Sequence, residues 1–207
     1  MNSNTERFQF QGAAGVIEAL RDEPEAASRG VAVIAHPHPL FGGTMDNKVV
    51  QTLARAFVQS GWTAVRFNFR GVGASAGEHD AGNGETEDLL ALVTAHAPDG
   101  PMALAGFSFG SFVVSRALQR LWPVRSIEKI VLVGTAAARF DVATLPPESH
   151  DRTLVIHGEQ DDTVPLQSVL DWARPQSLPV TVVPGGGHFF HGQLPLLKNL
   201  VARHLRS

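Results

Sequence analysis

Short apolar runs rich in Val, Ile and Phe alternate along this chain with longer segments in which apolar residues recur at helical spacing. Such runs indicate buried strands, and helices between them indicate β-α-β units that build a parallel sheet. The runs predicted as strands are 31–35, 62–69, 102–106, 127–133, 153–156 and 180–183. The segments predicted as helices are 46–60, 85–97, the segment that follows Ser108, 165–173 and 193–205. The pattern therefore predicts an α/β fold.

The first residues of the chain show a different pattern. Phe8 and Phe10 alternate with polar neighbours, which indicates a strand with one buried face. We expect residues 6–11 and 14–21 to form a pair of strands joined at Gly12.

Length and charge limit the possible classes of protein. The chain has 207 residues, of which 43% are apolar, enough for one core, so we expect a single domain over residues 1–207. Seventeen basic residues against twenty acidic ones leave no positive surplus for nucleic acid or an anionic membrane. The absence of cysteine excludes disulfides and thiolate catalysis.

Neither a secretion signal nor a membrane span is evident. Residues 1–7 lack the basic segment and apolar core of a signal peptide, and no later apolar run approaches the ~20 residues that span a bilayer. We therefore expect a soluble, cytoplasmic protein.

The pentapeptide Gly-x-Ser-x-Gly occurs twice, around Ser75 and around Ser108. A serine nucleophile must project from a sharp turn between a strand and a helix, and the following helix directs its first amides at the reacting carbonyl. Ser108 stands between an apolar strand and a helical segment. Ser75 instead lies in a glycine-rich stretch without a directly following helix. Ser108 is therefore the predicted nucleophile, and the Ser75 segment is predicted to be a connecting loop.

A serine nucleophile also needs a general base and an acid that orients it, here expected after later strands in the order Ser, Asp, His. Asp161 and Asp162 both follow the strand at 153–156, and Asp162 could instead cap the next helix. His188 ends a glycine loop after the last strand, where a neutral imidazole could reach the serine. His191 is a rival, although a surface or capping role is expected there.

Backbone amides must stabilise the oxyanion of an acyl-transfer intermediate. Phe109 should supply one. The second is expected from the loop His36-Pro37-His38-Pro39-Leu40-Phe41, in which the two prolines have no amide proton. His38, Leu40 and Phe41 remain, and we favour Leu40. The His36 and His38 side chains could instead hold this loop in shape.

Together these segments resemble the α/β-hydrolase superfamily, and within it short bacterial proteins with a His-Pro-His-Pro loop that are related to dienelactone hydrolases and serine esterases. The resemblance covers residues 36–47, 66–75, 106–110, 157–165 and 187–192. It implies a single-domain α/β-hydrolase fold with an eight-stranded, mostly parallel sheet flanked by helices. It also implies a catalytic triad of Ser108, Asp161 and His188, where the spacing of Asp161 from Gly158 matches the family. We expect no cofactor and no metal.

Two features of the sequence limit the kinds of substrate that can be expected. Dienelactone hydrolases use cysteine where this chain has Ser108, so their substrate is not transferred. Only about seventeen residues, 135–151, join two strands at the point where many superfamily members insert a lid domain. The sequence thus predicts a lidless serine hydrolase acting on a small or solvent-presented ester, with no nucleic acid or membrane partner. Its oligomeric state stays open.

Three other functions remain possible. A thioesterase or peptidase could use the same triad, because the triad determines acyl transfer and not the leaving group. A binding module could retain the fold without activity. A metal hydrolase could use a set of nitrogen and oxygen ligands drawn from His36, His38, Asp161, His188 and His191.

Overall fold

The computed structural model describes residues 5–206, so the outermost residues of the predicted domain 1–207, namely 1–4 and 207, lie outside the described part. The strands are β1 (Thr5–Gly12), β2 (Gly15–Asp22), β3 (Val31–Ala35), β4 (Thr63–Phe67), β5 (Met102–Phe107), β6 (Ile127–Val133), β7 (Thr153–Gly158) and β8 (Val180–Val183). The α-helices are α1 (Lys48–Gln59), α2 (Asn83–His96), α3 (Phe109–Leu121), α4 (Leu166–Ala173) and α5 (Leu194–His204). Short 3₁₀ turns cover Pro39–Phe41, Pro147–Arg152 and Arg174–Gln176.

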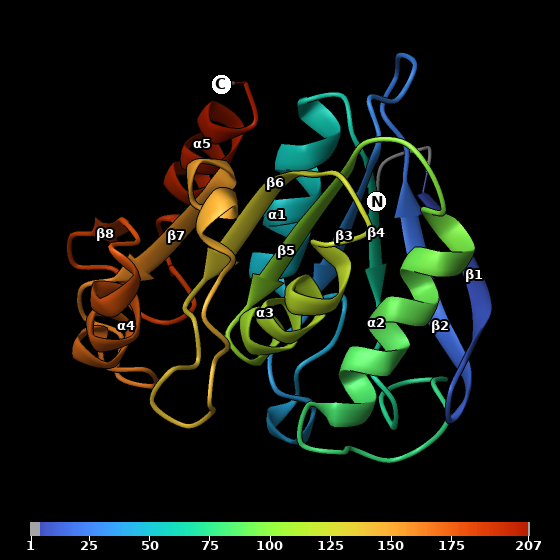
Figure 1. Cartoon of the computed structure of the whole chain (residues 1–207), viewed down its shortest axis with the longest axis horizontal. Coiled ribbons are helices and arrows are strands. Elements are labelled where there is room, and N and C mark those ends of the chain that lie inside the picture. Colours follow the sequence, from blue (N-terminus) through green and yellow to red (C-terminus); the bar gives the residue numbers. More distant parts are fainter. Residues whose placement is uncertain (1–4, 207) are drawn as a thin grey trace.

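The strands form one eight-stranded sheet in the order β1-β2-β4-β3-β5-β6-β7-β8 (Figure 1). β2 runs antiparallel to β1 and β4, and the pairs from β4 to β8 are parallel. The predicted opening hairpin is present, with Gly12 opposite Gly15 at its turn. The prediction of a single-domain, mostly parallel eight-stranded sheet is confirmed.

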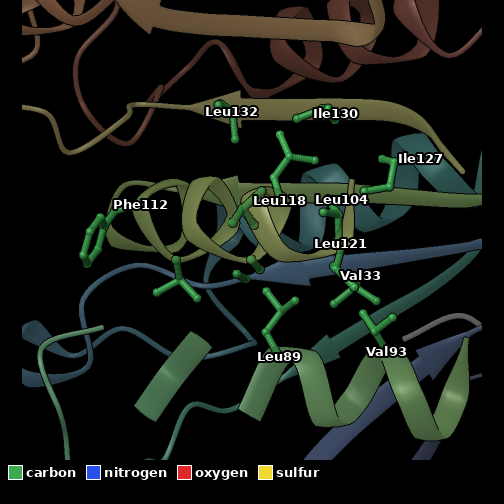
Figure 2. Close-up of a cluster of buried hydrophobic side chains, with 14 of the residues drawn as sticks. Val33, Leu89, Val93, Leu104, Phe112, Leu118, Leu121, Ile127, Ile130 and Leu132 are labelled. Atoms are coloured by element: carbon green, nitrogen blue, oxygen red, sulfur yellow. The ribbon is translucent and has the colours of Figure 1, made fainter. Parts of the chain in front are cut away.

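Helices cover both faces of the sheet (Figure 1). α2, α3 and α4 pack on one face, and α1 and α5 pack on the other. Figure 2 shows part of the first layer, where α2 and α3 meet β3, β5 and β6 through Val33, Leu89, Val93, Leu104, Phe112, Leu118, Leu121, Ile127, Ile130 and Leu132. Full burial of one such Leu, Ile or Val side chain stabilises the fold by about 1.5–3 kcal/mol.

The predicted limits of the elements agree with the structure to within two residues, and two of the differences have a clear physical cause. β4 ends at Phe67 and not at Phe69, because the Phe69 amide donates a hydrogen bond to the side chain of His36. α2 begins at Asn83 and not at residue 85. The Glu85 carboxylate accepts the amides of Asp80 and Gly82, which extends the helix towards its N-terminus.

The parallel strands bring several loops together at one edge of the sheet. The loops after β3, β5, β6, β7 and β8 all leave from the carboxyl ends of parallel strands, the edge at which open α/β sheets hold their ligands. This edge is therefore where a site is expected. Within residues 5–206, no helix combines the length and the apolar character needed to cross a bilayer.

Candidate active site

Ser108 occupies a strained turn between β5 and α3. Its backbone has φ 56° and ψ −116°, a conformation that residues other than glycine rarely adopt. A Cβ atom on Gly106 would lie 2.5 Å from the Gly110 backbone, and one on Gly110 would lie 2.2 Å from the Ala35 carbonyl oxygen. Both glycines of this pentapeptide are therefore required for α3 to pack this closely against the sheet.

Ser75, in the other pentapeptide, has a different role. Its hydroxyl donates to the carbonyl of Asn68 at 2.8 Å and accepts the amide of Glu18 at 3.1 Å. The residue is buried, and its hydroxyl ties the glycine-rich loop to β2 and to the end of β4. Ser75 is thus a structural link, as expected for a connecting loop.

Three predicted side chains meet at the carboxyl edge of the sheet. His188 Nδ1 lies 2.7 Å from Asp161 Oδ2, and His188 Nε2 lies 3.1 Å from Ser108 Oγ. A carboxylate can only accept, so the imidazole proton is on Nδ1, and Nε2 is free to accept the serine proton. All three residues are buried. The structure thus brings together the three residues that were predicted from the sequence.

Two loops hold the acid and the base at this distance. The Gln160 amide donates to the Gly186 carbonyl, and the Glu159 carboxylate accepts the Gly185 amide, each at 2.8 Å. A Cβ atom on Gly158 would lie 2.3 Å from the Gly186 carbonyl oxygen, so the two loops touch through their backbones. This contact fixes the position of the histidine loop relative to the loop after β7.

Asp161 is held in its ionised form. Burial is the largest influence and raises its pKa, but the hydrogen bonds from His188 and the Val164 amide outweigh it and lower the pKa overall. Its second oxygen, Oδ1, accepts the amides of Thr163 and Val164 at 3.0 and 2.7 Å. The alternative role considered for Asp162 is absent, since the side chain that caps this turn is that of Asp161. α4 itself starts after Pro165, without a capping side chain.

His157 supports the acid and was not assigned a role from the sequence. Its Nε2 donates to the Val164 carbonyl at 2.8 Å and also lies 3.4 Å from Asp161 Oδ2. Burial, the largest effect, lowers the pKa of His157, which keeps its imidazole neutral. Its position at the end of a strand, before Gly158, was the only sequence signal for this role.

The amide of Phe109 begins α3 directly after Ser108, and no acceptor for it exists within residues 5–206. The choice of Leu40 as the second oxyanion donor does not fit the loop. The Leu40 amide donates to His38 Nδ1 at 3.2 Å, and its side chain is 70% exposed. The Phe41 amide donates to the His38 carbonyl. Of the three candidates, the described part of the chain leaves only the His38 amide unpaired.

His36 holds this loop in shape, as one of the two sequence interpretations expected. Its Nδ1 donates to the Pro37 carbonyl at 2.6 Å, and its Nε2 accepts the Phe69 amide at 3.0 Å. Burial lowers the pKa of His36 to about 3, so the ring is neutral. Both ring nitrogens are occupied, and His36 cannot bind a metal. Within the described residues, no group of three or more His, Asp or Glu side chains is arranged to hold a metal ion.

The rival base, His191, is exposed and packs against the ring of Phe189 at 5.9 Å. It lies beyond His188 in the same loop and has no contact with Ser108 or Asp161. The surface role expected for His191 agrees with this position.

A cavity of about 530 Å³ opens at Ser108. Ser108, Phe109 and His188 form its inner end, and Phe41 and Phe189 lie on its wall with 75% and 42% of their surface exposed. The chain between β6 and β7 adds Arg139 and Phe140 and carries no inserted domain over this cavity. The cavity therefore connects Ser108 with solvent.

Comparison with known proteins agrees with this fold. A family model described as the α/β-hydrolase fold matches residues 38–153. A lidless α/β serine hydrolase from Xanthomonas campestris is 36% identical, with a TM-score of 0.88 over 100% of this chain and 95% of its own. An α/β serine hydrolase homologue from Coxiella burnetii is 37% identical, with a TM-score of 0.85 over 97% of each chain.

An uncharacterized protein of Rickettsia prowazekii is 30% identical over 195 residues, which is 89% of this chain and 82% of that protein. The family match and the solved serine hydrolases support hydrolase activity. The chain therefore belongs to the α/β-hydrolase family, in the form that has no lid domain.

Proposed function

We propose that this protein is a carboxylesterase that cleaves small or solvent-presented esters through an acyl-enzyme on Ser108, an activity of class EC 3.1.1. The observation that supports this most strongly is the unbroken hydrogen-bond chain from Asp161 through His188 to Ser108, with distances of 2.7 and 3.1 Å. No step of this chemistry requires a cofactor.

In the first half-reaction, Ser108 Oγ attacks the ester carbonyl carbon while His188 Nε2 takes the hydroxyl proton. Asp161 holds the imidazole in the required tautomer and stabilises the positive charge that the ring acquires. The tetrahedral intermediate then collapses, the bond to the leaving oxygen breaks, and His188 gives its proton to the departing alcohol.

The oxyanion of that intermediate is stabilised by two backbone amides, those of Phe109 and His38. Both amides lack acceptors within residues 5–206, and both residues line the cavity at Ser108. The amide of Phe109 also begins α3, where the partial positive charge of the helix N-terminus favours an anion. Each such donor contributes about 3 kcal/mol to lowering the barrier.

In the second half-reaction, a water molecule attacks the acyl-enzyme, and His188 Nε2 takes the proton of that water. Collapse of the second tetrahedral intermediate returns the proton to Ser108 Oγ and releases the carboxylic acid. The open cavity gives water a direct route to the acyl group. We expect a small-molecule partner, no nucleic-acid or membrane partner, and a cytoplasmic location.

The same steps would cleave a thioester or an amide, so a substrate panel tests the proposal. It compares p-nitrophenyl esters from acetyl to octanoyl, the corresponding acyl-CoA thioesters and aminoacyl p-nitroanilides, with the natural protein and with Ser108→Ala. We expect the highest kcat/KM for short esters, and a loss of about 10⁴-fold or more in Ser108→Ala. Thioester or anilide cleavage exceeding ester cleavage would reassign the leaving group. Hydrolysis that persists in Ser108→Ala would refute the mechanism.

A further inference from the structure

Arg139 lies in the loop after β6 and lines the cavity that opens at Ser108. The residue is exposed, and its guanidinium carbon lies 6.0 Å from the centre of the Phe41 ring on another loop of the cavity. A turn places it there, since the Arg139 amide donates to the Ala136 carbonyl at 3.2 Å. Arg139 thus presents a guanidinium, which is always protonated, at the exposed part of the cavity wall.

This charge has no counter-ion in the part of the chain that the structure describes. Within residues 5–206, no carboxylate forms an ion pair with Arg139. No Asp or Glu is among the described residues that line the cavity, whose ionisable residues are His38, Arg139 and His188. Asp161 lies behind His188, where its oxygens are occupied by His188 and by backbone amides. The described lining of the cavity therefore offers a ligand one guanidinium and no carboxylate.

The charge of Arg139 also affects the His38 side chain, which lines the same cavity. Burial is the largest cause that lowers the pKa of His38, and nearby His79 and Arg139 lower it further, against an opposing effect of Glu85. The His38 ring consequently stays neutral beside the amide proposed to bind the oxyanion. Arg139 is then the one full positive charge that the described cavity wall offers to a ligand.

The chemistry of this wall specifies a ligand with two parts. A guanidinium presents its N–H groups as a planar fork that matches a carboxylate and binds it more strongly than a neutral group. Beside it, the exposed rings of Phe41 and Phe189 offer apolar surface for an acyl or aryl group. An ester that carries a carboxylate away from the scissile bond would satisfy both parts.

We propose that Arg139 selects esters whose acyl or alcohol portion ends in a carboxylate, so that the substrates of this enzyme are anionic monoesters. The proposal rests on the esterase function proposed above and names its substrate class. Arg139 binds the remote carboxylate and takes no part in the chemical steps. Its loss should therefore raise KM for anionic esters and leave kcat nearly unchanged.

Two matched substrate pairs test this. In the first, p-nitrophenyl pentanoate is compared with p-nitrophenyl hemiglutarate, which differs by a carboxylate at the end of the acyl chain. In the second, phenyl acetate is compared with p-carboxyphenyl acetate, which carries the carboxylate on the leaving group. Uncatalysed hydrolysis is subtracted in each case. The proteins are the natural chain, Arg139→Gln, Arg139→Lys and the control Arg203→Gln, which removes an exposed arginine of α5 that does not line the cavity.

We expect Arg139→Gln to lower kcat/KM about tenfold for the carboxylate member of at least one pair, through KM, with a change of less than about twofold for its neutral partner. Arg139→Lys should restore part of the preference, because it keeps the charge but not the fork. Arg203→Gln should leave every ratio unchanged. Added salt should weaken the preference of the natural protein, because the arginine is exposed.

Equal changes for both members of each pair, or no change in any, would overturn the proposal. The role of Arg139 and the esterase mechanism on Ser108 can be refuted independently of each other. If Arg139→Gln hydrolyses all four esters like the natural protein while Ser108→Ala hydrolyses none, only the role of Arg139 is refuted. If Ser108→Ala remains active, the esterase mechanism itself is refuted.

Discussion

His188 donates its Nδ1 proton to Asp161 across 2.7 Å, although the two residues are 27 positions apart in the chain. The neighbouring carboxylate of Asp162 is exposed, and within residues 5–206 its only hydrogen-bond partner is the Thr163 hydroxyl. Two adjacent acids on one loop are thus clearly different in their surroundings. The backbone contact between the loops after β7 and β8 accounts for this difference.

Asp161→Asn should lower kcat for ester hydrolysis by about 10⁴-fold with little change in fold. The Asn oxygen can still accept the amides of Thr163 and Val164. Its NH₂ group would then face His188 Nδ1 and favour the tautomer that carries its proton on Nε2, which cannot accept the serine proton. Steady-state kinetics would measure this. Asp162→Asn, the matched control, should stay within about twofold of the natural protein. An equal loss in Asp162→Asn would contradict the assignment.

The two Gly-x-Ser-x-Gly serines should respond oppositely to removal of their hydroxyls. Ser75→Ala leaves the Glu18 amide and the Asn68 carbonyl without their buried partner, so the free energy of unfolding should fall by about 1–3 kcal/mol. The kcat of Ser75→Ala should equal that of the natural protein. Ser108→Ala should abolish hydrolysis and change the unfolding free energy by less than about 1 kcal/mol. Urea denaturation and ester kinetics on both variants check this. Loss of kcat in folded Ser75→Ala would be incompatible with its structural role.

His38→Pro tests the second oxyanion amide. His38 has φ −54° and ψ 123°, which proline adopts without strain, so the substitution removes the amide proton while the backbone can stay in place. His38→Ala is the control, because it removes the same ring and keeps the amide. We expect kcat to be about 10²-fold lower in His38→Pro than in His38→Ala. Circular dichroism would verify that both variants are folded. Equal kcat values would exclude the His38 amide as a donor.

The buried ring of His36 should make the fold sensitive to mild acid. Burial lowers the pKa of His36 from 6.5 to about 3, with a smaller lowering by His38 and an opposing hydrogen bond to Pro37. Between these two values the unfolded chain binds a proton that the folded chain does not, so stability decreases as the pH falls. The expected loss from this residue is about 2 kcal/mol of unfolding free energy between about pH 7.5 and pH 5.

Denaturation curves across this pH range test the assignment to His36. His36→Asn should be less stable than the natural protein near neutral pH, because it loses buried hydrogen bonds, but its stability should depend less on pH. His191→Asn, which changes an exposed histidine, should keep the full dependence of the natural protein. Parallel stability profiles for His36→Asn and the natural protein would contradict the account.

The sequence allowed most of the fold to be predicted, because the signals for it are local. The apolar runs that became β3, β5 and β6 are rich in β-branched or small residues, and the helical segments between them have clear apolar stripes. The order of strands in the sheet depends on contacts between distant segments. The placement of β4 between β2 and β3, for example, has no local signal.

For the site, the order of residues along the chain and the strand-to-helix context were sufficient to propose Ser108 and His188, whereas the choice of Asp161 over Asp162 depended on the family resemblance. The choice of the Leu40 amide as an oxyanion donor does not fit the structure, because it depended on the orientation of the His38 ring. The Leu40 amide is occupied by His38 Nδ1, a contact set by side-chain geometry and not by spacing. The position of Arg139 at the cavity could not be predicted from the sequence for a similar reason, because only the folding of two loops places it beside Phe41.

The central claim is that Ser108 is the acyl-accepting nucleophile, and covalent labelling tests it most directly. The natural protein is treated with a fluorophosphonate probe, digested, and mapped by mass spectrometry, with Ser75→Ala and Ser108→Ala as matched variants. We predict one adduct, on Ser108, in the natural protein and in Ser75→Ala, and none in Ser108→Ala. An adduct on Ser75, or labelling that persists in Ser108→Ala, would contradict the account.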